Sequence, residues 1–214
     1  MLRVVKNISL NSFMLGYLPA VREKDLIIFS GAVKKVDMNR ELKGEDDKLM
    51  RISSMTGDKE CCAVLHADFI AGNGCFNSAL AADKGVIAGV SDEINSATRD
   101  KGGALRCFEL SCGRVGIILG EDLFYPELWA RMALCAPSLV ICFSPSYRAG
   151  LYSALAQLCD CGVCAVSPER CGVYSDGGAL IKSSFEDFAF LPLPQSRRRA
   201  RVLTRKVRTS IERP

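Results

Sequence analysis

Short apolar runs rich in β-branched residues recur along the chain, and turn-forming or charged residues bound each of them. They lie at residues 26–29, 61–65, 86–88, 115–119, 139–143 and 163–166. Runs of this length and composition are typical of buried strands. The pattern therefore predicts a series of strands with little exposed surface.

Two segments between these runs have the features of helices. Residues 126–135 start with Pro126 at a plausible first helical position, carry Glu127 in the first turn and continue with good helix formers. A second helix is predicted at residues 149–159, ending before Gly162. Strand, tight turn, helix and strand form a βαβ unit, so we expect an α/β layered fold. The polar stretch 36–56 is predicted to be a solvated helix or loop.

The chain of 214 residues, with 49% hydrophobic and 24% charged residues, falls in the size range of one α/β domain. We find no repeat and no low-complexity linker, so residues 1–214 are interpreted as one domain, with 195–214 as a basic C-terminal tail. That tail carries eight Arg or Lys residues against Glu212, a charge of +7, so the rest of the chain carries about −3 of the net +4.

The tail interleaves its cations with Val202, Leu203, Val207 and Ile211 but contains no aromatic residue. Its arginines could contact phosphates, whereas its apolar residues favour docking on the domain. We therefore expect docking, and no nucleic-acid partner.

Neither a membrane span nor a secretory leader is expected. The longest nearly apolar run, residues 132–143, falls short of the roughly 20 residues that a span needs. Polar residues interrupt the N-terminal segment before a signal-peptide core could form. These features favour a cytoplasmic location, and the eleven cysteines, which lie mostly in apolar runs, are predicted to be reduced and packed.

Residues 113–145, GRVGIILGEDLFYPELWARMALCAPSLVICFSP, carry the most specific motif. They resemble the signature segment of the nitrilase-like (carbon-nitrogen hydrolase) family, including Gly116, Asp122, the Pro126-Glu-Leu128 run and the trailing Ser144-Pro-Ser146. The Glu-Asp pair at 121–122 also occurs in glutaminase domains of that family. The alternative interpretation is a generic βαβ unit.

Weaker similarities follow in the same order at residues 25–31, 76–80, 85–93 and 163–170. The resemblance implies a four-layer αββα sandwich, here shortened at the N-terminus between Val5 and Asp25. It also implies pairing, as a homodimer or with an active relative.

In the family, a glutamate acts as base, a lysine stabilises the oxyanion and a cysteine attacks the substrate. The aligned positions hold Gly31, Glu93 and Gly120. Glycine can neither attack a carbonyl nor take a proton, and a carboxylate opposes a developing oxyanion. We therefore expect a catalytically inactive scaffold with a structural, regulatory or ligand-binding role. The alternative is an active small-amide hydrolase with a non-standard nucleophile.

Acidic residues give a further candidate site. Glu121 and Asp122, with Asp92 and Glu93 nearby, could form a pocket for a cation or amine, or act as paired carboxylates. In the alternative interpretation, Asp122 holds its own turn or caps the following helix, and Glu121 is solvated.

The thiols and the single histidine are weaker candidates for a functional site. Cys159, Cys161, Cys164 and Cys171 have the spacing of a thiolate cluster, but strand neighbours point to opposite faces, so neither a metal nor another cofactor is expected. His66 is interpreted as a packed or edge-strand residue. The surrogate nucleophiles considered are Cys107, Cys112, Cys135 and Cys142.

Overall fold

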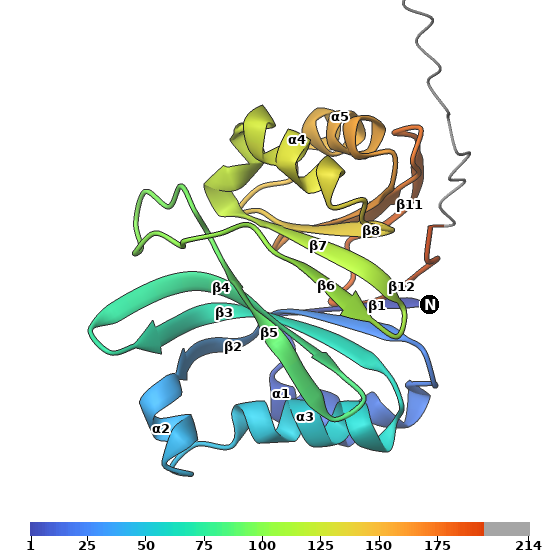
Figure 1. The fold of residues 1–214 in the computed structure, drawn as a ribbon. Coiled ribbons are helices and arrows are strands. Elements are labelled where there is room, and N and C mark those ends of the chain that lie inside the picture. The colour runs from blue at the N-terminus through green and yellow to red at the C-terminus, as the bar shows by residue number, and fades with distance from the viewer. Residues whose placement is uncertain (195–214) are drawn as a thin grey trace, which may run out of the picture.

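A computed structural model describes residues 1–194 as two six-stranded sheets packed face to face, with helices on both outer surfaces (Figure 1). The first sheet has the order β12 (Phe188–Leu191), β1 (Leu2–Lys6), β2 (Leu26–Asp37), β3 (Cys62–Ala71), β4 (Gly74–Asp83) and β5 (Val86–Asp92). The second has the order β11 (Leu180–Ser184), β10 (Cys171–Tyr174), β9 (Gly162–Val166), β8 (Leu139–Phe143), β7 (Gly113–Leu119) and β6 (Cys107–Leu110).

The helices form the two outer layers. The first sheet is covered by α1 (Leu10–Gly16), η1 (Leu18–Ala20), α2 (Met38–Leu42) and α3 (Lys48–Asp58). The second sheet is covered by α4 (Pro126–Leu134) and α5 (Ala149–Cys159), and the short helix η2 (Gly120–Phe124) joins β7 to α4. This arrangement confirms the predicted αββα sandwich.

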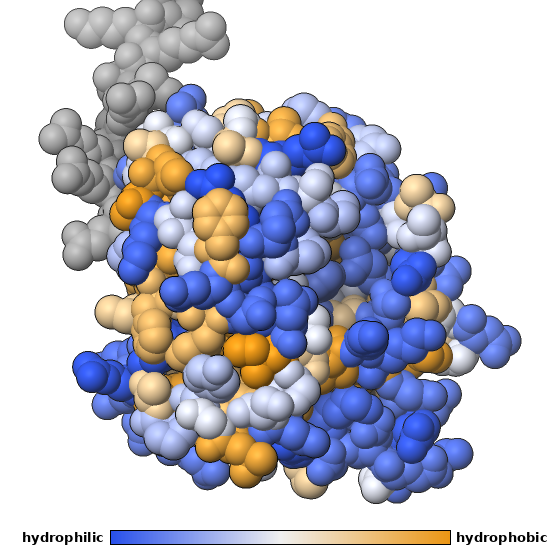
Figure 2. Space-filling view, turned by 180° about the vertical axis from the view of Figure 1, so that it is seen from behind, coloured by the Kyte–Doolittle hydropathy of each residue, from blue (hydrophilic) through white to orange (hydrophobic). Residues whose placement is uncertain are grey.

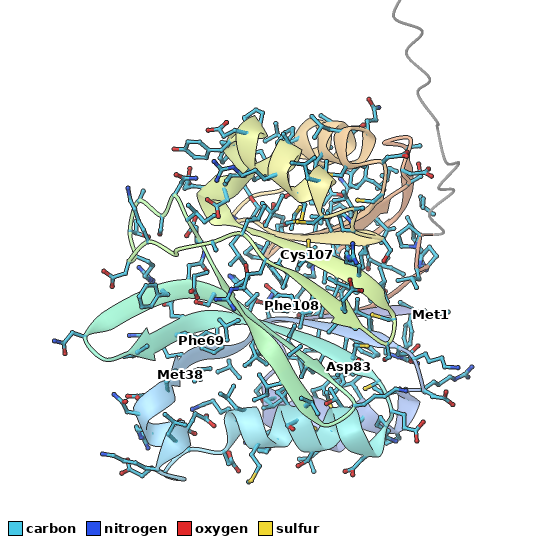
Figure 3. The ribbon with its side chains drawn as sticks, viewed as in Figure 1. Met1, Met38, Phe69, Asp83, Cys107 and Phe108 are labelled. Carbon is cyan, nitrogen blue, oxygen red and sulfur yellow. The ribbon has the colours of Figure 1, made fainter. Side chains whose placement is uncertain are left out.

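Strand alternation divides the core into three apolar layers. In β8, Ile141 and Phe143 face the other sheet, whereas Val140 and Cys142 face the helices α4 and α5. The same division in β6 puts Phe108 between the sheets and Cys107 on the helix side (Figure 3). Because the central strands are buried on both faces, their sequences are continuous apolar runs.

The parallel pairing of strands positions the functional region. β2 pairs in parallel with β1 and β3, and β8 pairs in parallel with β7 and β9. Parallel strands end at the same edge of a sheet, and ligands of α/β proteins commonly bind outside these carboxyl ends. The loops after β2, β7, β8 and β9 are therefore expected to form the ligand-binding site.

The predicted elements are largely confirmed. The helix at 149–159 has the predicted bounds, α4 ends one residue before the predicted 135, and every predicted strand lies within or overlaps an observed one. The strands β1, β4, β6, β10, β11 and β12 were not predicted. Each has polar, glycine or alanine residues within a short run, which weakens the apolar signal.

The prediction for residues 36–56 was partly wrong. β2 continues to Asp37, and α3 buries Leu49, Ile52 and Met55 against the first sheet, so this segment is amphipathic rather than fully solvated.

The segment between β1 and β2 is short. It contains only η1 and α1, a helix of seven residues whose N-cap, Ser9, accepts a hydrogen bond from the Ser12 backbone N–H. No helix in residues 1–194 is long and apolar enough to cross a membrane.

Candidate functional site

A cavity of about 310 Å³ lies where the two sheets meet the loops at their ends. Its lining comes from the ends of β8 and β9, from β2, β3 and β4, from the loop after β5 and from the start of η2. Polar groups on the first sheet therefore face the strand-to-helix turn of the second sheet across one cavity that is open to solvent on one side.

Gly120 and Glu93 are in direct contact in this cavity. Gly120 starts η2 with φ +49°, and a Cβ atom at this position would overlap Glu93 Oε1. The Glu93 side chain is only 4% exposed, and its carboxylate accepts hydrogen bonds from the Glu121 backbone N–H (2.6 Å) and from Asn77 Nδ2 (2.9 Å). The carboxylate thus fills the space into which a side chain of residue 120 would extend.

Gly31 lies beside this cavity rather than in its wall. It sits in the irregular part of β2 after Ser30, has φ +78° and lines a neighbouring cavity of about 410 Å³ that shares Ser30, His66 and Asn77 with the first. A Cβ atom at Gly31 would lie 3.2 Å from Asn7 Oδ1, which is a tight contact. The fold therefore brings positions 93 and 120 into contact and puts position 31 nearby.

The four acidic residues considered for a pocket separate into two pairs. Glu93 and Glu121 line the cavity. Asp92 instead accepts a hydrogen bond from Ser78 Oγ (2.6 Å), and Asp122 accepts backbone N–H groups of Ile94 and Asn95 (both 2.8 Å). The hypothesis of a four-carboxylate pocket was wrong in this respect.

The alternative interpretation was wrong for Asp122, which holds the loop after β5 rather than its own turn or helix, but Glu121 is exposed, as that interpretation expected. Asp122 is 1% exposed, and burial raises the pKa of its carboxyl group although the N–H groups of Ile94 and Asn95 oppose the shift. By holding residues 94 and 95, Asp122 fixes the loop that carries Glu93 against η2.

His66, Asn77 and Glu93 form a chain of hydrogen bonds along the wall. Asn77 donates through Nδ2 to Glu93, so its Oδ1 faces His66 Nε2 at 2.8 Å and makes Nε2 the protonated nitrogen. Burial lowers the pKa of His66 below 6.5, so the ring is neutral at pH 7 and Nδ1 remains an acceptor. The ring also stacks on Phe143 of the other sheet, with 4.6 Å between ring centroids.

An ion pair lies at the rim. The Arg99 guanidinium donates to both carboxylate oxygens of Asp68, at 3.1 Å and 3.0 Å. Fork-to-fork pairing of this kind neutralises both groups and fixes their orientation. Arg99 is therefore engaged with Asp68, and the charge deeper in the cavity is that of Glu93.

The thiols considered as surrogate nucleophiles lie away from the cavity. Cys142 is fully buried on the helix side of β8, and burial raises the pKa of its thiol. Cys107 packs against Met132, Cys112 lines a different cavity at the opposite end of β7, and Cys135 is exposed at the end of α4. None of the described residues lining the central cavity is a cysteine.

The four closely spaced cysteines do not converge. Cys164 and Cys171 face the space between the sheets, whereas Cys159 and Cys161 face the helix layer. The second sheet therefore separates the two pairs. The basic tail, 195–214, lies outside the described residues.

Sequence reasoning missed His66 and Asn77 as site residues. His66 was interpreted only as a packing residue, and it does pack, yet it also lines the cavity. Asn77 lies in the 76–80 segment that resembles the family, which is a signal that could have identified it. The pairing of Asn77 with both His66 and Glu93 depends on the register of β3 and β4, which the sequence does not specify.

Comparison with known proteins identifies the fold. No known family model matches the sequence, and no curated protein sequence does. Among solved structures, the chain is similar to Nit3 of Saccharomyces cerevisiae, a member of branch 10 of the nitrilase superfamily, with TM-score 0.72 and 14% identity over 97% of this chain and 96% of Nit3. It is also similar to the CN-hydrolase superfamily protein XC1258 of Xanthomonas campestris (TM-score 0.67, 17% identity, 86% of each chain) and to a carbon-nitrogen hydrolase of Helicobacter pylori (0.68, 13%, 86% and 85%).

These similarities confirm the nitrilase-like architecture that residues 113–145 indicated. The chain has the nitrilase-superfamily fold. Sequence identities between 13% and 17% establish the fold alone, so the chemistry of the cavity must be argued from its own residues.

Proposed function

We propose that this protein is a catalytically inactive nitrilase-fold protein that binds a small molecule non-covalently in the cavity beside Glu93 and Gly120. The observation that carries the proposal is the Glu93 carboxylate, which takes up the space of a nucleophilic side chain at position 120. A group that fills this space by hydrogen bonding to the η2 backbone leaves no place for a covalent intermediate.

The replaced positions support the proposal for separate chemical reasons. Gly120 offers no nucleophile, and Gly31 offers no base to activate one. Glu93 would face a developing oxyanion with the wrong charge, since such an intermediate is stabilised by N–H donors or cations. The backbone N–H of Glu121, which could donate to an oxyanion at this turn, is instead bonded to Glu93.

The alternative is a small-amide hydrolase with a different nucleophile. A thiol nucleophile must reach the substrate and must ionise near neutral pH. Cys142 is buried in a core with a raised thiol pKa, and Cys107, Cys112 and Cys135 are separated from the cavity, so the alternative lacks a positioned group.

Hydrolysis assays test the proposal. The wild type, Gly120→Cys and the triple variant Gly31→Glu, Glu93→Lys, Gly120→Cys would be incubated with small amides, glutamine and nitriles. We expect no turnover by the wild type, since loss of a nucleophile alone costs roughly a millionfold in rate. We also expect none from Gly120→Cys, because the new side chain overlaps Glu93 and an unassisted thiol with a pKa of about 8.5 is mostly protonated.

Only the triple variant is expected to give a signal, and the change Gly31→Glu would be strained by the left-handed backbone at that position and by Asn7. Turnover of any of these substrates by the wild type would overturn the proposal, and its loss in Glu93→Gln would locate the reaction in this cavity. Each cysteine-to-serine variant of Cys107, Cys112, Cys135 and Cys142 provides the corresponding check on the thiol alternative.

A further inference from the structure

The Glu93 carboxylate is buried beside the cavity without a cation. Its two hydrogen-bond donors, Asn77 Nδ2 and the Glu121 N–H, are both neutral. No ion pair among residues 1–194 includes Glu93. A carboxylate held out of water in this way lacks the counter-charge that normally accompanies buried charges.

Arg99 interacts electrostatically with Glu93 but forms no ion pair with it. Three carboxylates and one guanidinium line the cavity, and the guanidinium, Arg99, is already bound to Asp68. His66 is held neutral by its lowered pKa and donates its only N–H to Asn77. The lining therefore has a negative balance, with acceptor sites on Glu93 and on His66 Nδ1.

The Glu93 carboxylate can also accept further hydrogen bonds. A carboxylate offers about four lone-pair positions, and the two bonds to Asn77 and Glu121 use one on each oxygen. The second position on each oxygen can receive a parallel pair of N–H groups from a planar cation, which is the strongest geometry for a carboxylate.

We propose that the cavity binds a small organic cation, of the alkyl amidinium or primary ammonium class, whose N–H groups donate to Glu93. This inference rests on the proposed function, because it assigns a ligand class to the same non-catalytic cavity. The volume of about 310 Å³ is at the lower end for ligand sites, so the cation is small. Phe143, Pro145 and Val166 supply apolar surface for a short alkyl chain.

Three probes with the same heavy-atom skeleton separate charge from shape: butyramidinium, butyramide and butyrate. Calorimetric titration of the wild type at pH 7 is expected to give binding of butyramidinium at least tenfold tighter than butyramide, and no binding of butyrate. Equal or tighter binding of butyramide or butyrate, or no binding of butyramidinium, would overturn the inference. This comparison uses the wild type alone and does not depend on any variant folding.

A matched pair of variants then locates the site. Glu93→Gln keeps the side-chain size and removes the charge, and it is expected to weaken butyramidinium binding at least tenfold. Glu127→Gln removes an exposed carboxylate in the first turn of α4 and is expected to leave binding unchanged. Unchanged binding in a folded Glu93→Gln, verified by circular dichroism, would contradict the assignment.

The outcomes of the two proposals are distinguishable. Failure of butyramidinium to bind, with no amide turnover, would reject the ligand class but leave the proposal of an inactive protein standing. Hydrolysis of butyramide by the wild type, measured as release of butyrate and ammonia, would reject the proposal of an inactive protein, whichever probe binds most tightly.

Discussion

The carboxylate of Glu93 stands where a side chain on Gly120 would extend, and it is held there by the N–H of the next residue, Glu121. The two positions are 27 places apart in the sequence, and they directly follow strands of different sheets, β5 and β7. Glycine at 120 and glutamate at 93 are therefore complementary, and a change at either position affects the other.

This contact predicts a loss of stability in Gly120→Ala. The added Cβ overlaps Glu93, and alanine is strained at φ +49°, so the free energy of unfolding should fall by about 2–4 kcal/mol. Gly150→Ala, in α5 with no atom near the new Cβ, is the control and should not be destabilised. In the double variant Glu93→Ala, Gly120→Ala, part of the loss should be recovered in urea unfolding. No recovery would contradict the overlap.

Asp25 is predicted to stabilise the fold through its buried pair with Arg3. Arg3 Nε lies 2.5 Å from Asp25 Oδ2, and both side chains are at most 5% exposed. Removing one partner of such a pair costs about 3 kcal/mol or more, so Asp25→Ala should lower the free energy of unfolding by that amount. Glu23→Gln, which removes an exposed ion pair with Lys24, should change it by less than about 1 kcal/mol.

The same pair gives a pH dependence with a defined sign. Burial raises the pKa of Asp25, but the Arg22 N–H and Arg3 outweigh it and hold the pKa below 3.8. A depressed pKa means that the stabilisation is present above pH 3.8 and is lost as the pH falls through the folded value. Unfolding curves of the wild type and Asp25→Ala should therefore converge at acid pH, and a constant difference would contradict the pairing.

His66 is predicted to titrate below pH 6.5. Burial lowers its pKa, while the hydrogen bond to Asn77 and the charges of Asp68 and Glu93 oppose the shift. Since it is the only histidine, its ring proton resonance can be followed directly by NMR. Asn77→Ala removes a contact that favours the charged ring and should lower the midpoint further, whereas Asn39→Ala, an exposed control, should not. A wild-type midpoint at or above 6.5 would be contrary to this prediction.

The lowered pKa of His66 also affects the free energy of unfolding. As the pH falls below 6.5, the unfolded chain takes up a proton before the folded chain does, so stability is lost between pH 6.5 and the folded pKa of His66. His66→Gln should remove this component of the pH dependence. Its persistence in the variant would assign the effect to other groups.

The cysteines are predicted to be reduced and metal-free. Seven are buried, and Cys135 is the exposed one. Thiol titration of the unfolded protein should give eleven groups, and elemental analysis no stoichiometric zinc or iron. In the native protein Cys135 should react first, so Cys135→Ser should remove the fast phase and Cys142→Ser should not. Fewer than eleven thiols, or bound metal, would refute the prediction.

A homodimer is predicted from the resemblance to the family. Apolar residues are exposed in separate patches among hydrophilic ones, as the face in Figure 2 shows, so the interface has to be located by variants. Light scattering at micromolar concentration should give twice the monomer mass. Leu134→Glu on α4 and Leu15→Glu on α1 change residues that are 87% and 85% exposed on opposite outer layers, and dissociation by one alone would identify the layer. A monodisperse wild-type monomer would contradict the dimer.

The sequence by itself indicated the class of architecture, the central strands and the two helices of the second sheet. Strands that are buried on both faces, such as β8, must be apolar throughout, so they can be recognised from the sequence alone. The residues that start and end α4 and α5 lie within one turn of the helix ends, so these helices can also be recognised from local sequence. The motif at 113–145 is also continuous in sequence, and it therefore indicated the nitrilase-like fold and position 120, while the weaker similarities at 25–31 and 85–93 indicated positions 31 and 93.

Only the tertiary structure decided what these positions do together. The contact of Glu93 with Gly120 and the stacking of His66 on Phe143 join different sheets, and their formation depends on strand register and on how the sheets pack. The direction of each cysteine likewise follows from the face of its strand, which separates Cys164 from Cys161. The periodicity of the sequence indicates which residues are buried but not which buried groups are in contact. For that reason only the folded structure shows that the buried Glu93 carboxylate has no ion-pair partner among residues 1–194.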